Sequence, residues 1–572
     1  MAPSRSAFIR LWLVPVCLVV LLRLIHSTTL GYDPAIQLQA ARNLLNGRGL
    51  TVYSIPGESD LSAPNRLQVL TYFPAGYSVC AAAVLALGCS AFSALKFLGA
   101  AATILGWWGW ARLAYFFMRD GLERSAFCRA VAIAIAIVTP FLTTPPWTGT
   151  DIFLWATVPW IMQFVTRSAR SDGQYPIYFD LAAGALCGLA ILMRYQALFL
   201  AAYACLLIAL QSFAKVSLFF RRIALFVLGL APFVGAQIFV NCLRSNTPLE
   251  AGGISFHQDG AGLAHFLWTS ISFVTAANYS FIWWFPARSI DFLTQFGGNA
   301  PWLLVITLIA LPTIPVAFAI RIGHGKVAAA ARDARCASMG LIIALPLFLC
   351  ACALGGVIYA GVPRYYVPVI PLAVLAAYAY AVGTGTTQKS VAYAARVVAI
   401  AYLTGFLCSS LLRIGLLAIP GDLGDNQRGQ LLGSKTVGHW FSSKPEYAFS
   451  SAREYVVGLL REHPETILVT NRENWFYAEP DIDHSRLHRL EDLRSSYVTG
   501  AARIVILAEE SAPSADTSLQ WYRSWGKAVP AHYFESVPGL HLLRRFPEEN
   551  IKILEAEIPA GTKIELKHPA QT

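Results

Sequence analysis

The feature that most constrains this chain is the recurrence of apolar runs long enough to cross a lipid bilayer. The hydrocarbon layer is about 30 Å thick, and roughly 20 helical residues span it. With 56% hydrophobic and only 13% charged residues among its 572, the chain is not an ordinary soluble globule. The sequence therefore predicts an all-α polytopic membrane protein. The candidate crossings are Leu11–His26, Ala126–Leu142, Ile152–Val165, Leu181–Met193, Ala197–Leu210, Ile223–Val240, Trp302–Ile320, Met339–Ala360, Val367–Val382 and Val397–Ile419.

The positive charges are distributed as expected for membrane topology. A net charge of +11 could indicate a nucleic-acid partner, but the basic residues cluster at the ends of apolar runs. Under the positive-inside rule these clusters mark alternate loops as cytoplasmic. They are Arg5 and Arg10; Arg112, Arg119, Arg124 and Arg129; Arg167 and Arg170; Lys215, Arg221 and Arg222; and Arg321, Lys326, Arg332 and Arg335.

This topology places Asp33, Asp151, Arg194, His257, Arg364 and the carboxyl-terminal region outside. It requires the apolar block Gly76–Phe117 to cross an odd number of times, although its length suggests two helices. About 11 to 13 crossings result. The first run lacks a small-residue cleavage site, so it is expected to act as a signal anchor.

Two domains are expected. Residues 1–419 form the transmembrane domain, with outer loops at 28–74 and 243–301, and residues 420–572 form an extracytoplasmic α/β domain. In the first loop, apolar residues recur at helical spacing between Ala35 and Leu50, which predicts an interfacial helix lying on the membrane. In the tail a helix is predicted at Ala452–Arg461, and strands at Thr466–Val469, Ile504–Leu507 and Gly539–Arg544.

The cysteines indicate neither a disulfide framework nor a metal centre. None of the eleven follows Cys408, so the tail has no disulfide. No CxxC pair, HExxH or other metal-ligand spacing occurs, and no cofactor is expected, although a divalent metal is not excluded.

Two carboxylates are the candidate catalytic residues. Asp33 follows the first apolar run, in Gly31-Tyr32-Asp33-Pro34, and Asp151 follows a Pro- and Gly-broken turn at the start of an apolar helix. Acidic groups at the mouth of a membrane bundle are costly and often functional, and a raised pKa suits a general base. The alternative for each is a helix N-cap.

Basic residues on the same side are the candidate phosphate ligands. Arg194 interrupts an apolar run where a hairpin should turn, and Arg364 precedes another apolar helix. A guanidinium holds a phosphate bidentately, whereas the alternative is a snorkelling anchor near a helix end. Arg66 and Tyr365 are further donor-binding candidates. Tyr72, His257 and His265 are candidate substrate-loop residues, and the two histidines could equally be solvated loop residues.

The order of these motifs resembles the GT-C glycosyltransferases, and most closely their bacterial branch related to protein O-mannosyltransferases and the lipid A aminoarabinose transferase. The resemblance covers roughly residues 8 to 415. The motifs are Asp33, then Ala40-Ala41-Arg42-Asn43-Leu44-Leu45-Asn46-Gly47-Arg48-Gly49, Tyr72-Phe73-Pro74-Ala75-Gly76-Tyr77, Thr150-Asp151, and Arg364-Tyr365 with Pro368 and Pro371.

The resemblance implies an inverting, metal-independent or weakly metal-dependent transferase in the bacterial inner membrane. Such an enzyme takes a sugar from a polyprenyl phosphate on the outer face and gives it to a lipid, polysaccharide or protein acceptor. By that likeness Asp33 is the base and Asp151 a supporting acid. Phe73 stands where related enzymes often carry a phosphate-binding Lys, so Arg194, Arg364 or Arg66 holds the phosphate instead, or the donor differs.

Two other functions compete with this one. A secondary transporter or lipid flippase has ionisable groups near the membrane midplane and internal repeats, whereas here the acidic residues stand at helix mouths and no repeat is visible. A non-catalytic scaffold that displays the α/β tail leaves the ordered Asp and Arg residues unexplained.

Overall fold

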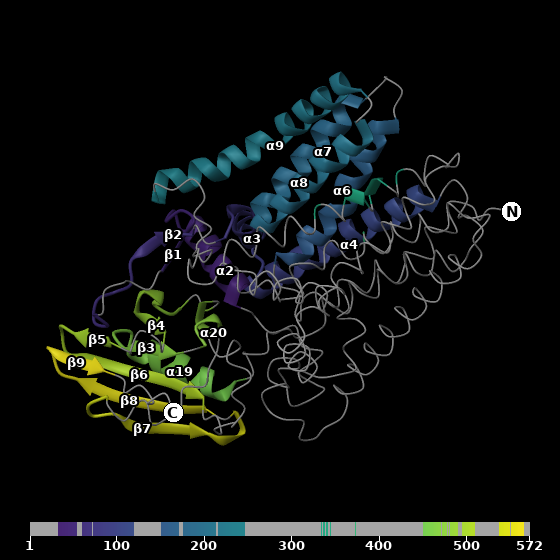
Figure 1. The fold of residues 1–572 in the computed structure, drawn as a ribbon. Helices are drawn as coiled ribbons and strands as arrows, with labels where there is room; N and C mark the ends of the chain where they lie inside the picture. Colours follow the sequence, from purple (N-terminus) through teal and green to yellow (C-terminus); the bar gives the residue numbers. More distant parts are fainter. Residues whose placement is uncertain are drawn as a thin grey trace, which may run out of the picture. The chain divides into compact units, whose positions relative to one another are not determined.

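The computed structural model describes two compact units (Figure 1). The first contains the described residues of 71–77 and 96–421, and the second those of 26–70, 78–95 and 422–572. The predicted boundary between residues 419 and 420 lies outside the described residues and stays a prediction. The described residues are 32–53, 60–70, 73–118, 150–170, 176–212, 215–245, 333, 336, 337, 339, 340, 344, 372, 450–470, 472–477, 479, 481–489, 495–509, 537–549 and 551–565.

The first unit is a bundle of apolar helices. Its helices are α4 (Ala91–Met118, from residue 96 on), α6 (Asp151–Arg170), α7 (Pro176–Met193), α8 (Leu198–Ser212) and α9 (Val216–Ser245), with the 3-10 turn η1 (Tyr195–Ala197) between α7 and α8. The core lies where α4, α6, α7 and α8 meet, around Trp110, Trp155 and Tyr203. The predicted runs at 152–165, 181–193, 197–210 and 223–240 are thus confirmed as helices.

Three helical segments in the described part of the chain are long and apolar enough to cross a membrane: Ala91–Leu113, Tyr195–Ser212 and Val216–Cys242. Large apolar side chains on α9, such as Phe220 and Leu228, are more than 60% exposed, as expected for a surface that faces lipid. The remaining predicted crossings fall outside the described residues, so the total of 11 to 13 stays a prediction.

The ambiguous block at residues 76–117 forms two helices of unequal length. These are α3 (Ala75–Ala86), with 12 residues, and α4, with 28. At 1.5 Å per residue α3 extends only about 18 Å, which is less than the hydrocarbon thickness. One helix of this block is therefore long enough to cross, as the odd count requires.

Glycines bring α7 and α9 into close contact. A Cβ at Gly184 of α7 would overlap the carbonyl oxygen of Phe226, and a Cβ at Gly229 of α9 would overlap that of Leu181. Gly184 and Gly188 form a GxxxG pattern, which lets helix backbones approach inside a membrane. The contact between these two helices depends on the absence of side chains there.

A buried ion pair joins the same two helices one turn before the contact between Gly184 and Phe226. Arg222 of α9 and Asp180 of α7 are 1% and 0% exposed. Arg222 donates from Nε to Asp180 Oδ2 at 3.0 Å and from Nη2 to Oδ1 at 3.2 Å, and Nη2 also donates to the carbonyl oxygen of Val165 at 2.7 Å. Ser168 donates to the same carboxylate at 2.6 Å. Arg222, which the sequence suggested as a topological charge, is also a structural residue.

The second unit contains a five-stranded mixed sheet with the order β4-β3-β6-β8-β7. β3 is parallel to β4 and β6, and β8 is antiparallel to β6 and β7; for example, Ile467 pairs with Ile504 and Ile506 with Leu554. A separate antiparallel pair joins β5 and β9. The strands are β3 (Ile467–Thr470), β4 (Leu487–Arg489), β5 (Ser495–Val498), β6 (Ala502–Glu509), β7 (His541–Phe546), β8 (Ile551–Ile558) and β9 (Thr562–Glu565).

Helical segments flank these strands. They are α19 (Ser451–Glu462), α20 (Asn474–Tyr477), η6 (His484–Arg486) and η11 (Pro547–Glu549). α19 is N-capped by Ser450, whose side chain accepts from the amide of Arg453. The predicted helix at 452–461 and the three predicted strands are confirmed, whereas β4, β5, β8 and β9 were not foreseen.

In the described part of the first predicted outer loop, the helix α2 (Tyr32–Leu45) is followed by a hairpin of β1 (Thr51–Tyr53) and β2 (Leu67–Val69). The prediction of a helix here is confirmed, but its predicted location on the membrane surface was wrong. Gln37 and Gln39 are as fully buried as Ala35 and Leu38, with at most 1% of each exposed. A helix lying on a membrane exposes a polar face to water, whereas α2 is enclosed by protein.

Candidate functional site

The best-defined polar site of the helix bundle lies where one helix begins and another ends. α6 begins at Asp151, directly after Thr150, and α7 ends just before Arg194. Arg194 has extended backbone angles (φ −159°, ψ 127°), and its amide still donates to the Ala190 carbonyl at 2.8 Å. The predicted hairpin at Arg194 is confirmed, and its side chain is directed to the start of α6.

Arg194 forms an ion pair with Asp151 and donates from Nη1 to the Thr150 hydroxyl at 2.9 Å. Asp151 is 2% exposed and Arg194 8%. A snorkelling anchor extends its guanidinium to water, so this alternative does not describe Arg194. Two charges are buried here, which is costly unless each is paired and hydrogen-bonded. Asp151 also opens its helix, so the structure is compatible with a capping role.

A second polar group adjoins this pair and was not found from the sequence. Gln237 of α9 donates from Nε2 to the Tyr195 hydroxyl at 3.2 Å and to Asn241 Oδ1 at 2.9 Å, and its Oε1 accepts from the Ala75 amide at 3.1 Å. Gln237 and Asn241 are 4% and 0% exposed. Two amides four residues apart in an apolar run were the available signal.

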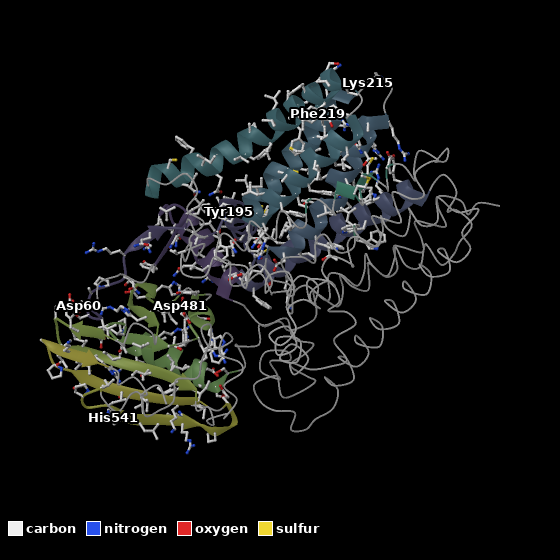
Figure 2. All side chains as sticks on the ribbon, viewed as in Figure 1. Asp60, Tyr195, Lys215, Phe219, Asp481 and His541 are labelled. Carbon is white, nitrogen blue, oxygen red and sulfur yellow. The ribbon has the colours of Figure 1, made fainter. Side chains whose placement is uncertain are left out.

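The two polar groups described for this bundle, around Arg194 and around Arg222, lie at opposite ends of it (Figure 2). Figure 2 shows Tyr195 at one end of the helices α7 to α9 and Lys215 and Phe219 at the other. Arg222 lies one turn after Phe219, and Arg194 directly precedes Tyr195. This separation agrees with the predicted topology, in which Arg194 and the basic cluster at 215–222 face opposite sides.

Asp33 belongs to the other unit. It lies in the first turn of α2, is partly exposed, and its carbonyl oxygen accepts from Gln37 Nε2 at 3.1 Å. A carboxylate in a first turn is favoured by the helix dipole, so the capping alternative and a chemical role remain compatible with this position. Arg66, directly before β2, is exposed.

The remaining predicted site residues lie outside the described residues. They are Tyr72, His257, His265, Arg364 and Tyr365. In the part of the chain that is described, no three His, Cys, Asp or Glu side chains are grouped so that they could hold a metal ion.

Comparison with known proteins adds a structural likeness. No protein-family model matches the chain, and no curated protein sequence matches it. The structure is similar to that of ArnT from Cupriavidus metallidurans bound to undecaprenyl phosphate, with a TM-score of 0.49 and 12% identity over 96% of this chain and 98% of that one.

Two further solved structures are similar. The Archaeoglobus fulgidus oligosaccharyltransferase in the apo form matches with a TM-score of 0.41 and 12% identity, over 85% of this chain and 64% of that one. The arabinofuranosyltransferase AftD from Mycobacteria matches with 0.44 and 13%, over 98% and 42%. These neighbours are GT-C glycosyltransferases, the superfamily that the sequence resembles. Likeness of this size assigns the chain no activity.

Proposed function

We propose that this chain is an integral membrane glycosyltransferase of the GT-C type. It moves a sugar from a polyprenyl-phosphate donor to an acceptor hydroxyl at the outer face of the cytoplasmic membrane, with inversion. The observation that carries this proposal is the buried Arg194, paired with Asp151 and Thr150 at the polar end of an apolar helix bundle. The sequence motifs that it shares with the superfamily support it.

The reaction balances as a single displacement. The acceptor oxygen forms a bond to the anomeric carbon while the bond from that carbon to the phosphate oxygen breaks. The acceptor proton passes to the Asp33 carboxylate, and the electron pair of the broken bond leaves with the polyprenyl phosphate, which gains one negative charge. Attack from the side opposite the leaving group inverts the anomeric centre.

Arg194 is the proposed ligand of the departing phosphate. A fixed guanidinium in a low-dielectric site stabilises charge that develops in the transition state. Asp151 supports it, because its ion pair fixes the orientation of the guanidinium. Arg66, Arg364 and Tyr365 stay candidate donor ligands, and Tyr72, His257 and His265 stay candidate substrate-loop residues.

The test is transfer of radiolabelled sugar from polyprenyl phosphate by the full-length protein in lipid nanodiscs. We expect wild type to consume the donor, and Asp33→Asn to lose about 10²- to 10⁴-fold in rate, as removal of a general base does. Arg194→Lys keeps the charge but not the bidentate geometry, so its rate should fall as well. Unchanged transfer by Asp33→Asn would exclude Asp33 as the base.

A protein that consumes no polyprenyl-linked sugar in any form would contradict the transferase proposal. The same nanodisc preparation, reconstituted into sealed vesicles, would then be measured for lipid or solute flux, which is the activity expected of a transporter or flippase.

A further inference from the structure

The first outer loop forms part of the core of the carboxyl-terminal domain. Leu61 is 3% exposed and packs in the cluster that contains Ile467, Ile504 and Val498. Next to it, Asp60 makes a parallel β-bridge with Tyr497, and the Leu61 amide donates to the Tyr497 carbonyl at 2.9 Å. A short segment of the loop therefore extends the fold of the domain.

Polar contacts fix the same segment. Thr499 donates to Asp60 from its hydroxyl at 2.6 Å and from its amide at 3.2 Å, and Asn65 Nδ2 donates to the Leu487 carbonyl at 2.7 Å. Burial raises the pKa of Asp60, but hydrogen bonds from Ser62 and Thr499 outweigh it and hold that pKa below its usual value. The carboxylate is therefore charged, and its removal would leave these donors without their acceptor. Figure 2 shows Asp60 beside the strands of this unit.

A second contact reaches the helix that carries Asp33. Arg42, in the last turn of α2, donates from Nη1 to the carbonyl oxygen of Tyr477 in α20 at 3.3 Å, and α2 packs against α20. The hairpin that follows α2 reinforces it, because Tyr53 and Tyr477 both lie edge-on to the His484 ring, with centroid distances of 6.4 and 6.1 Å.

We propose that the carboxyl-terminal domain positions α2 for catalysis, and that Arg42 is a positioning residue that fixes this helix on α20. The proposal rests on the role of Asp33 proposed above. Arg42 lies nine residues after Asp33, about 14 Å along the helix axis, so it acts through α2 and not on the reacting atoms.

Physical reasons make such support necessary. α2 has only 14 residues, and an isolated helix of that length is marginal in water. Its stability and its direction therefore come from the surfaces around it. A displacement of about 1 Å at a reacting group costs up to about 10²-fold in rate, even when the cause lies far from the chemistry.

Hydrogen exchange of the wild-type protein tests the coupling without any substitution. In increasing denaturant, amides of residues 33–45 should become exposed with the same opening free energy as those of β3 and β6, because they open as one cooperative unit. If α2 opens well before these strands, it is not fixed by the domain, and the proposal is wrong.

The variant test uses Arg42→Ala, with Arg48→Ala as the matched control. Arg48 follows α2 and donates to the Tyr53 hydroxyl of its own hairpin at 2.9 Å. We expect Arg42→Ala to accelerate exchange in residues 33–45 and to lower kcat about 10- to 100-fold, with the donor KM changed by less than about twofold. Arg42→Lys, which keeps a donor, should recover part of the rate, and Arg48→Ala should change neither property.

The outcomes separate this proposal from the proposed function. If Asp33→Asn keeps its activity, the proposed role of Asp33 as the base is wrong. Opening of α2 and β3 with the same free energy would still show that the two are structurally coupled. If Asp33→Asn is inactive but Arg42→Ala exchanges faster and keeps the wild-type kcat, the positioning role is wrong and the transferase proposal stands. Should Arg42→Ala fail to fold, the wild-type exchange measurement decides.

Discussion

Arg222 holds both carboxylate oxygens of Asp180, at 3.0 and 3.2 Å, in the interior of the bundle. The pair joins α9 to α7 near the start of α9, and Arg222 is the last of the basic residues at positions 215 to 222. Because neither residue reaches water, the energy of one charge depends on the presence of the other.

Removal of one partner of this pair should be severely destabilising. Asp180→Ala leaves a buried guanidinium without its counter-charge, at a cost of about 3–5 kcal/mol. The measurement is the midpoint of thermal unfolding in detergent, with Arg221→Ala as the control, because Arg221 is the exposed neighbour. The double variant Asp180→Leu, Arg222→Met should regain most of the loss, and an unchanged midpoint in Asp180→Ala would contradict the buried pair.

A single methyl group between α7 and α9 should also be costly. Gly184→Ala places a Cβ on the backbone carbonyl of Phe226, which cannot rotate away as a side chain could. We expect a loss of about 1–3 kcal/mol from this overpacking, measured as the same unfolding midpoint. Gly235→Ala in α9 is the control, since no atom from elsewhere in the described residues lies within 4 Å of its Cβ position. Equal unfolding midpoints for the two variants would mean that α7 and α9 pack less closely than this structure shows.

The carboxyl-terminal domain should lose stability as the pH falls. Burial lowers the pKa of His488 to about 4, assisted by the charge of Arg486 and opposed by that of Asp60. Burial likewise lowers the pKa of His484 to about 4. Both imidazoles are therefore neutral in the folded domain at pH values where the unfolded chain, with a pKa near 6.5, is protonated.

The unfolded state thus binds more protons between about pH 4 and 6.5, and stability should decrease as the pH falls through that window and stay level above it. For His488, which is 2% exposed, the loss is at most about 3 kcal/mol. Hydrogen exchange of β6 amides across this range measures it. His488→Leu should remove the part of the dependence that His488 contributes and leave that of His484, and a variant as sensitive as wild type would rule out His488 as a cause.

The first outer loop should prove necessary for the stability of the distant domain. Leu61→Ala removes buried methyl groups from the cluster around Ile504, at an expected cost of about 2–5 kcal/mol. The readout is exchange of the amides in β3 and β6, more than 400 residues away in sequence. Leu67→Ala, at a position 41% exposed in the same loop, should leave that exchange within error of wild type.

Several elements could be predicted because their signals are local. The Arg194 hairpin is marked by a charged residue inside an apolar run, and the strand at 504–507 by consecutive β-branched and apolar residues. The partner of Arg194 was harder to predict from the sequence, because a side-chain pair between α6 and the α7–α8 turn depends on how helices pack. Asp151 was singled out, but its ion pair was not foreseen.

The docking of Asp60 and Leu61 left no local signal at all. The segment is too short for a periodic pattern, and its partner Tyr497 is remote in the sequence. The burial of Gln37 and Gln39 was not predicted, for a related reason. Polar residues on one side of a helix indicate water only if no other part of the chain covers that side.

The bridge between Asp60 and Tyr497 also bears on the order in which the protein is made. Thr499, which donates to Asp60, is synthesised 439 residues later than Asp60.

 At about 5–20 residues per second, that interval lasts roughly 20 to 90 s. During this time the segment at Asp60 has no partner from the carboxyl-terminal domain. The helices between residues 60 and 497 are all synthesised before that partner.

The carboxyl-terminal domain therefore completes a structure that a much earlier part of the chain begins. A ribosome that stalls before Tyr497 would release a polypeptide that still has its apolar helices but lacks the strand that receives Asp60. In such a product Asp60 and Leu61 would lack the strand and the core that bury them in the folded protein.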